Sequence, residues 1–150
     1  MTPHLVLPIT LTLTGAAVLA NIWLGTRIAR LRRAHRVSIG DGGIEPLTAR
    51  MRAQANYIEH TPFFLILVGL IELARGPQLW LWIVGMAFIL ARIAHGLGMD
   101  GGRMKRLRAI GMITTVLILL GLSAYGIFLA YQGTAQSRGM TYAEAARAST

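Results

Sequence analysis

Two long stretches of this sequence contain no charged side chain, which restricts the folds that the chain can adopt. The first extends from Leu5 to Thr26 and the second from Ile110 to Ala130. A helix needs about 20 predominantly apolar residues to cross the hydrocarbon core of a bilayer, and both stretches are long enough. Only 14% of the residues are charged and 54% are hydrophobic, whereas about a quarter of a soluble domain is charged. We therefore predict an all-α membrane protein.

Two shorter apolar segments, Phe63–Ile71 and Leu79–Ala91, lie between these stretches. Each can cross the bilayer only if the polar residues beside it face other helices, because ionisable groups that face lipid are costly. This condition applies to Asn56, Glu59, Arg92 and His95. At the far end of the second helix, we expect Glu72 to pair with Arg75 three residues later.

Turn-forming residues separate the apolar segments. Gly76 and Pro77 favour a tight turn, and glycines also cluster at 40–43 and at 96–102. We therefore predict one domain over residues 1–150, a four-transmembrane-helix bundle. Its helices are expected at approximately 5–31, 47–74, 77–98 and 107–131, followed by a polar tail at 132–150.

The basic residues are unevenly distributed between the ends of the predicted helices. A net charge of +9 can indicate nucleic-acid binding, but cations placed between apolar segments favour membrane topology instead. The first and third connections and their flanks carry Arg27, Arg30, Arg32, Arg33, Arg36, Arg50, Arg52, Arg103, Lys105, Arg106 and Arg108. The second connection and the tail carry Arg75, Arg138 and Arg147. The positive-inside rule then predicts cytoplasmic first and third connections, with both termini on the opposite side.

One face of the predicted second helix carries three polar side chains. Arg52, Asn56 and Glu59 are spaced i, i+4, i+7, so they share one face. Such a row can bind a zwitterion, because Arg52 can take a carboxylate, Glu59 an ammonium group, and the amide can donate or accept between them. The alternative is that Arg52 and Glu59 form buried ion pairs that lock helices together.

Further polar residues are expected near the same membrane face. Arg92 and His95 share a face of the third helix, and Arg106 and Arg108 begin the fourth. A cation beside a bound thiol lowers the thiol pKa from about 8.5 and raises its nucleophilic fraction; the alternative for any one arginine is contact with lipid headgroups. His60 is either a ligand contact or an interfacial residue. The chain has no cysteine, its histidines lack metal-ligand spacing, and we predict no metal site.

The second helix resembles the family of membrane-associated proteins in eicosanoid and glutathione metabolism, known as MAPEG. The motif that carries the resemblance is Arg52-x-Gln54-x-Asn56-x-x-Glu59-x-x-Pro62. The preceding residues 32–38 resemble the basic end of the family's first helix. Residues 91–95 resemble the third helix of its prostaglandin E synthase branch. The resemblance extends over roughly Arg27 to Thr115.

This resemblance implies a homotrimer of four-helix protomers, with glutathione between neighbouring protomers near the cytoplasmic face and a lipophilic substrate entering from the bilayer. The implied activity is that of a glutathione-dependent transferase or peroxidase acting on hydrophobic electrophiles or lipid hydroperoxides. The alternative is a non-enzymatic lipid-binding membrane protein of the same fold, which the family also contains. A transporter subunit is disfavoured, because the polar residues gather near one face instead of lining a path across the membrane.

The resemblance also implies roles for individual residues. The implied catalytic residue, which stabilises the thiolate, is Arg108 or Arg106, and we favour Arg108. Two positions depart from the pattern of the family's enzymes, since Met99 and His60 stand where tyrosine is common. The glutathione-binding residues would be Arg32, Arg33, Arg52, Gln54, Asn56, Glu59, His60, Arg92 and His95.

Overall fold

The chain folds into four long helices. The computed structural model describes residues 6–148, without the side chains of Arg103 and of residues 135–148. The helices are α1 (Pro8–His35), α2 (Glu45–Arg75), α3 (Leu79–Gly98) and α4 (Lys105–Ala148), and a short 3-10 helix, η1 (Gly102–Met104), precedes α4. Residues 6–148 contain no strand, and all four helices are long and apolar enough to cross a membrane. The prediction of an all-α, four-helix membrane bundle is confirmed.

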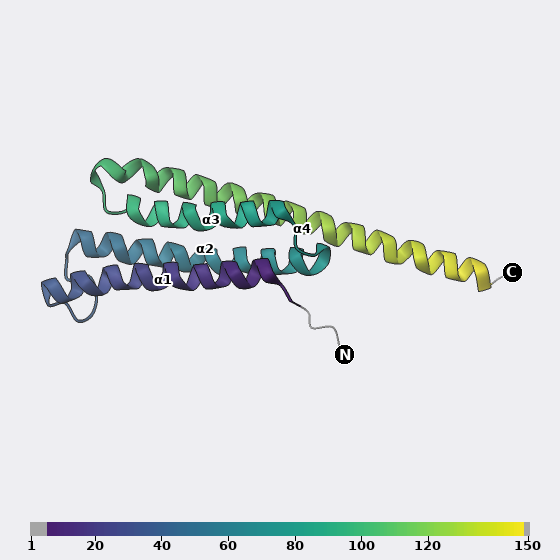
Figure 1. Cartoon of the computed structure of the whole chain (residues 1–150), viewed down its shortest axis with the longest axis horizontal. Coiled ribbons are helices and arrows are strands. Elements are labelled where there is room, and N and C mark those ends of the chain that lie inside the picture. The colour runs from purple at the N-terminus through teal and green to yellow at the C-terminus, as the bar shows by residue number, and fades with distance from the viewer. Residues whose placement is uncertain (1–5, 149–150) are drawn as a thin grey trace.

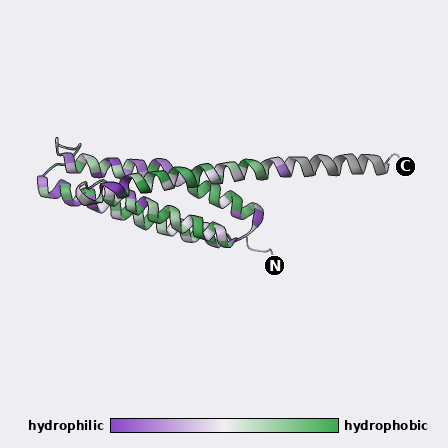
Figure 2. Cartoon of the chain, turned by 90° about the horizontal axis from the view of Figure 1, so that it is seen from above, coloured by the Kyte–Doolittle hydropathy of each residue, from purple (hydrophilic) through white to green (hydrophobic). Residues whose placement is uncertain are grey.

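The helices are arranged as two antiparallel pairs. Figure 1 shows α1 beside α2 and α3 beside α4, with α4 extending beyond the other three helices. The connections 36–44 and 99–104 lie at the end of the bundle away from the N-terminus, and Figure 2 shows hydrophilic residues there. We call this end, with its two connections and the adjoining helix turns, the basic end. The helices thus bring the two arginine-rich connections together.

The fourth helix is longer than the sequence predicted. The apolar length predicts an end near residue 131, but the helix continues without interruption to Ala148. Residues 132–148 contain several alanines and no proline, and the two glycines at 133 and 139 disfavour a helix far less than proline would. The predicted tail therefore belongs to α4 up to Ala148. The expected start of the first helix at Leu5 and the last two residues, 149–150, lie outside the described residues.

The core lies between the helix pairs, and much of the remaining surface is apolar. Buried side chains recur every three or four positions along α1 at Ile9, Leu13, Ala17, Ala20 and Leu24. Phe64 of α2 stacks on Phe88 of α3 with ring centroids 3.7 Å apart. On the other side of α1, Leu11, Leu19 and Ile22 are 56–69% exposed. An apolar surface of this kind is suited to contact with lipid or with another transmembrane helix.

A buried carboxylate joins α2 to the start of α1. Glu72 is only 1% exposed and accepts hydrogen bonds from the backbone nitrogens of Ile9 (2.9 Å) and Thr10 (2.8 Å) and from the Thr10 hydroxyl (2.7 Å). These are among the N–H groups that a helix start leaves without partners, and the helix dipole favours a negative charge there. The expected pair of Glu72 with Arg75 is therefore wrong; Arg75 donates to Gln132 instead.

An acidic side chain also organises the start of α2. Asp41 accepts hydrogen bonds from the Gly43 backbone nitrogen (3.1 Å) and from the Thr48 hydroxyl (2.8 Å). These two donors hold the pKa of the Asp41 carboxyl below its usual range. The connection is thereby fixed against the first turns of α2, close to Arg52.

Candidate functional site

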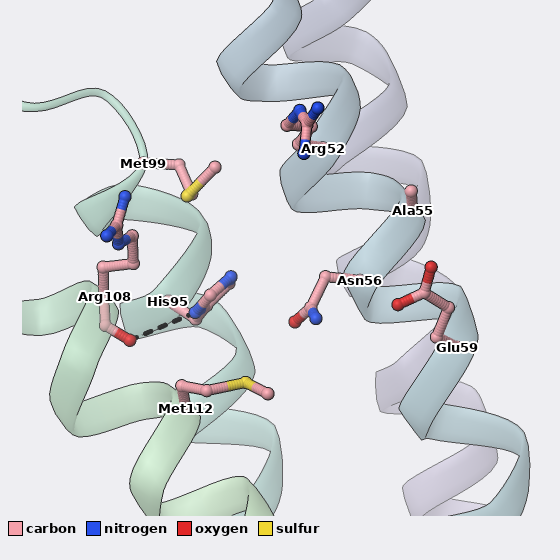
Figure 3. A pocket seen from close by; sticks show the side chains of 8 residues that line it. All are labelled: Arg52, Ala55, Asn56, Glu59, His95, Met99, Arg108 and Met112. Carbon is pink, nitrogen blue, oxygen red and sulfur yellow. Dashed lines mark hydrogen bonds between the residues drawn. The ribbon is translucent and has the colours of Figure 1, made fainter.

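A pocket opens at the basic end between α2 on one side and α3 and α4 on the other. Its volume is about 460 Å³, within the range of roughly 300–1,000 Å³ typical of small-molecule sites. Figure 3 shows the side chains that line it, which come from three helices. They are Arg52, Ala55, Asn56, Glu59, His95, Met99, Arg108 and Met112.

The α2 wall of this pocket carries the three polar residues that the helical spacing placed on one face. Arg52 and Glu59 are both exposed. Among the described residues, ion pairs form only at Asp100, so neither Arg52 nor Glu59 has an ion-pair partner among them. Within the described part of the chain, Arg52 and Glu59 therefore do not form the buried interhelical ion pairs of the alternative interpretation. The wall presents a cation, an amide and a carboxylate to the pocket.

On the opposite wall of the pocket, His95 of α3 contacts Arg108 of α4. The ring nitrogen Nδ1 of His95 lies 3.1 Å from the backbone oxygen of Arg108, and Figure 3 marks this contact. The Arg108 side chain also lines the pocket and makes no hydrogen bond or ion pair among the described residues. One residue thus contacts the imidazole through its backbone and offers a guanidinium to the pocket.

Two glycines permit this close approach of α3 and α4. A Cβ atom on Gly98 would lie 2.2 Å from the backbone nitrogen of Arg108. A Cβ atom on Gly111 would lie 2.4 Å from the Ala91 carbonyl oxygen and 2.7 Å from the His95 nitrogen. Any larger residue at either position would push the helices apart and break the contact between His95 and Arg108.

Arg92 lies behind the pocket instead of lining it. The side chain is 1% exposed, and its Nη2 donates to the Asn56 Oδ1 at 2.6 Å and its Nη1 to the Thr115 hydroxyl at 3.2 Å. A guanidinium only donates hydrogen bonds, so the Asn56 oxygen must face Arg92. The amide nitrogen Nδ2 of Asn56 makes no hydrogen bond within the described residues and remains available as a donor.

Several residues expected at the site lie elsewhere in the single chain. Gln54 faces α1 and donates to Asn21 at 3.2 Å. The His60 ring contacts the backbone oxygen of Asn56 at 2.8 Å but does not line the pocket. Arg106 is exposed and also lies outside it.

The two arginines expected from the first helix, Arg32 and Arg33, lie apart from this pocket. Both line a separate depression of about 400 Å³ at the end of α1, together with Arg36. Arg32 also donates to the backbone oxygen of Ser38 at 2.7 Å. Within one chain, neither side chain lines the cavity between α2, α3 and α4.

One cluster at the basic end was not anticipated from the sequence. Asp100 forms ion pairs with Arg27 and, at 3.0 Å, with Arg50. Arg27 also donates to the Gly96 carbonyl at 2.9 Å and stacks over Trp23. The cluster ties α1 and α2 to the end of α3, directly after the pocket residue Met99. The signal that could have found it is an isolated acidic residue in an otherwise basic region.

Two comparisons with known proteins bear on this arrangement. The family model described as MAPEG family matches residues 10–128. The curated Inner membrane protein YecN of Escherichia coli K12 is 33% identical over 94 residues, which cover 62% of this chain and 70% of the relative. The protein of the same name from Escherichia coli O6:H1 gives the same identity and coverage.

Proposed function

The chain belongs to the MAPEG family, and on this premise we propose that it is a glutathione-dependent transferase or peroxidase acting on hydrophobic electrophiles or lipid hydroperoxides. It is an integral, multi-pass membrane protein, and its family includes glutathione transferases and peroxidases. The observation that carries the proposal is the pocket itself. Its lining combines Arg52, Glu59 and Arg108, none of which has an ion-pair partner among the described residues.

The chemistry of glutathione fits the α2 wall. The γ-glutamyl end of this substrate carries a carboxylate and an ammonium group beside each other. In our proposal Arg52 binds the carboxylate and Glu59 binds the ammonium group. The free Nδ2 of Asn56 donates to a carboxylate oxygen, and such charge-assisted hydrogen bonds are the stronger ones. The cavity of about 460 Å³ is large enough for a tripeptide bound in this way.

Arg108 supplies the activating charge in this proposal. The thiol of a cysteine residue has a pKa of about 8.5, and a nearby cation lowers it. The guanidinium of Arg108 lies in the pocket without a competing carboxylate on it, so it can stabilise the thiolate. Met99 and Met112 provide apolar contacts on the same wall for a hydrophobic second substrate. Catalysis then consists mainly of positioning and of electrostatic stabilisation.

The proposal extends to a homotrimer with its basic end in the cytoplasm. The chain exposes large apolar side chains along α1, and the Gln54–Asn21 pair lies on the α1 side of α2, away from the pocket. A neighbouring protomer would bring its own Gln54, Arg32 and Arg33 toward the pocket, where the two arginines would meet a second glutathione carboxylate. This arrangement accounts for their absence from the lining within one chain.

Turnover of a chlorinated nitrobenzene with glutathione tests the proposal. Arg108→Ala should lower kcat/KM by about 100-fold or more, the loss typical of removing one stabilising donor. Lys105→Ala is the matched control, because it removes an exposed cation at the same helix start and should leave turnover unchanged. Arg106→Ala distinguishes the second candidate arginine. Equal turnover in the wild type, Arg108→Ala and Arg106→Ala would refute the proposed mechanism.

A non-enzymatic lipid-binding protein is the second candidate. The observation that favours it is the apolar part of the pocket lining, where Met99 and Met112 supply no hydroxyl group. Isothermal titration calorimetry separates the two functions. Glutathione binding that disappears in Glu59→Gln supports the enzyme, whereas no binding by the wild type supports the lipid-binding protein.

A further inference from the structure

The contact between His95 and Arg108 fixes the protonation pattern of the imidazole. The partner of Nδ1 is a backbone carbonyl oxygen at 3.1 Å, and a carbonyl can only accept a hydrogen bond. Nδ1 must therefore carry the hydrogen, so in the neutral ring Nε2 keeps its lone pair. The residue is only 6% exposed yet lines the pocket. In Figure 3 its second ring nitrogen is turned away from the Arg108 carbonyl and toward α2.

The imidazole is held in this orientation by the packing of two helices. Gly98 and Gly111 bring α4 against α3 closely enough for the carbonyl of Arg108 to reach the ring. The backbone of Arg108 therefore orients a proton acceptor, while its side chain presents a cation to the same cavity. A base and an anion-stabilising group at a fixed separation are the two parts needed to form a thiolate.

The groups that face His95 come from all three helices of the pocket. Arg92 of α3, Arg108 of α4 and His60 of α2 act electrostatically on the ring. The polar side chains that line the pocket beside His95 are Arg52, Asn56, Glu59 and Arg108, and among these lining residues Glu59 is the one carboxylate.

We propose that Nε2 of His95 is the proton acceptor for the bound thiol. The proposal rests on the glutathione-dependent function proposed above and adds a catalytic residue to it. In the first step the S–H bond breaks, the proton moves to Nε2, and the electron pair stays on sulfur as a thiolate beside Arg108. General bases of this kind contribute about 10²–10⁴-fold to a rate.

The proton taken by His95 is used or released in the second step. With a hydroperoxide, the thiolate attacks the outer peroxide oxygen, an S–O bond forms and the O–O bond breaks. Sulfur is oxidised to a sulfenic acid, the peroxide is reduced, and the departing alkoxide takes the proton from Nε2 to become an alcohol. With an aryl chloride, a C–S bond forms, chloride leaves with its electron pair, and the imidazolium passes the proton to water.

The substitution His95→Asn tests the proposal, because an asparagine amide can still donate to the Arg108 carbonyl but cannot accept a proton in place of Nε2. Stopped-flow absorbance should show thiolate formation slowed by about 100-fold or more, the lower end of the range for a general base. Added imidazole should restore part of the rate at saturating glutathione, where a change in affinity no longer limits it. His35→Asn is the matched control, because His35 is exposed at the end of α1 and should change nothing.

The possible results separate this inference from the proposed function. If the wild type gives no thiolate signal at saturating glutathione, the proposed function fails. If the wild type gives the signal and His95→Asn gives it equally fast, only the role of His95 is overturned. A slow variant that imidazole does not rescue also overturns it, since the effect is then structural.

A measurement on the unsubstituted protein is independent of the folding of any variant. Nitrogen-15 NMR of ring-labelled histidine should show His95 with a protonated Nδ1 and an unprotonated Nε2. The opposite tautomer would overturn the proposal, because Nε2 would then carry a hydrogen and could not accept the thiol proton.

Discussion

The substitution Asn56→Asp should separate binding from stability, because the two ends of this side chain have different partners. The oxygen Oδ1 accepts a hydrogen bond from Arg92 at 2.6 Å, and only Nδ2 is left to donate into the pocket. Aspartate keeps an oxygen on Arg92 and converts that contact into an ion pair. It also replaces the NH₂ group that faces the pocket with a second oxygen, which repels a ligand carboxylate.

The size of the effect follows from the interaction that is lost. A hydrogen bond to a charged group contributes about 1.5–3 kcal/mol, and every 1.4 kcal/mol corresponds to a tenfold change in affinity. Glutathione should therefore bind Asn56→Asp roughly 10- to 150-fold more weakly than it binds the wild type. The free energy of unfolding should not fall, because the buried guanidinium of Arg92 gains a carboxylate where it had only neutral partners.

Calorimetry with glutathione and unfolding in detergent micelles together measure these two quantities. Gln132→Glu is the matched control, because Gln132 also accepts a hydrogen bond from an arginine through its amide oxygen, at 2.7 Å from Arg75. That pair lies at the other end of the bundle, so the control should bind glutathione normally. If Asn56→Asp binds glutathione as tightly as the wild type, the assignment of Nδ2 as a donor to the ligand is refuted.

Three further outcomes follow from the packing and capping contacts. Glu72→Gln should lower the free energy of unfolding by about 3 kcal/mol, because an amide NH₂ would meet the N–H donors of α1; unchanged unfolding in a detergent titration would contradict the capping role. Gly111→Ala should abolish thiolate formation by pushing α4 off α3, whereas Gly121→Ala, with no neighbour within 4 Å, should not. The ionised Asp41 stabilises the fold above its unfolded pKa of about 3.9, and this contribution is lost as the pH falls through its lowered folded value. Thermal unfolding at pH 6 and pH 3 should therefore differ less in Asp41→Asn than in the wild type.

Helical periodicity was sufficient to predict one wall of the pocket. Arg52, Asn56 and Glu59 share a face because of their spacing within a single helix, and they line the cavity together. The positions of the four helices likewise followed from apolar length. The sequence misplaces the end of α4 because the polar composition after residue 131 is typical of a tail, whereas the helix continues through 132–148.

The other wall depends on contacts between helices, which no periodicity within one helix reveals. Arg92 and His95 share a helix face, yet Arg92 contacts Asn56 from behind and His95 faces the pocket. What sets this difference is the register between α3 and α4, which is fixed by the small volume of Gly98 and Gly111. In the sequence, Gly98 is only one of the glycines clustered at 96–102, and nothing marks Gly111 as a contact position.

The partners of acidic residues were the hardest feature to predict. Glu72 binds the start of α1, 62 and 63 residues away, and Asp100 joins Arg27 and Arg50 from two other helices. Local spacing favours partners three or four residues away. It cannot identify partners that are brought together only when the helices pack.

In the proposed function, the pocket at the basic end binds glutathione and holds it as a thiolate beside Arg108. Difference absorbance in the ultraviolet, recorded as glutathione is added to the detergent-solubilised protein, measures this directly. We expect a saturable thiolate signal at neutral pH that is lost in Arg108→Ala. No thiolate signal at any glutathione concentration, or an equal signal in Arg108→Ala, would contradict it.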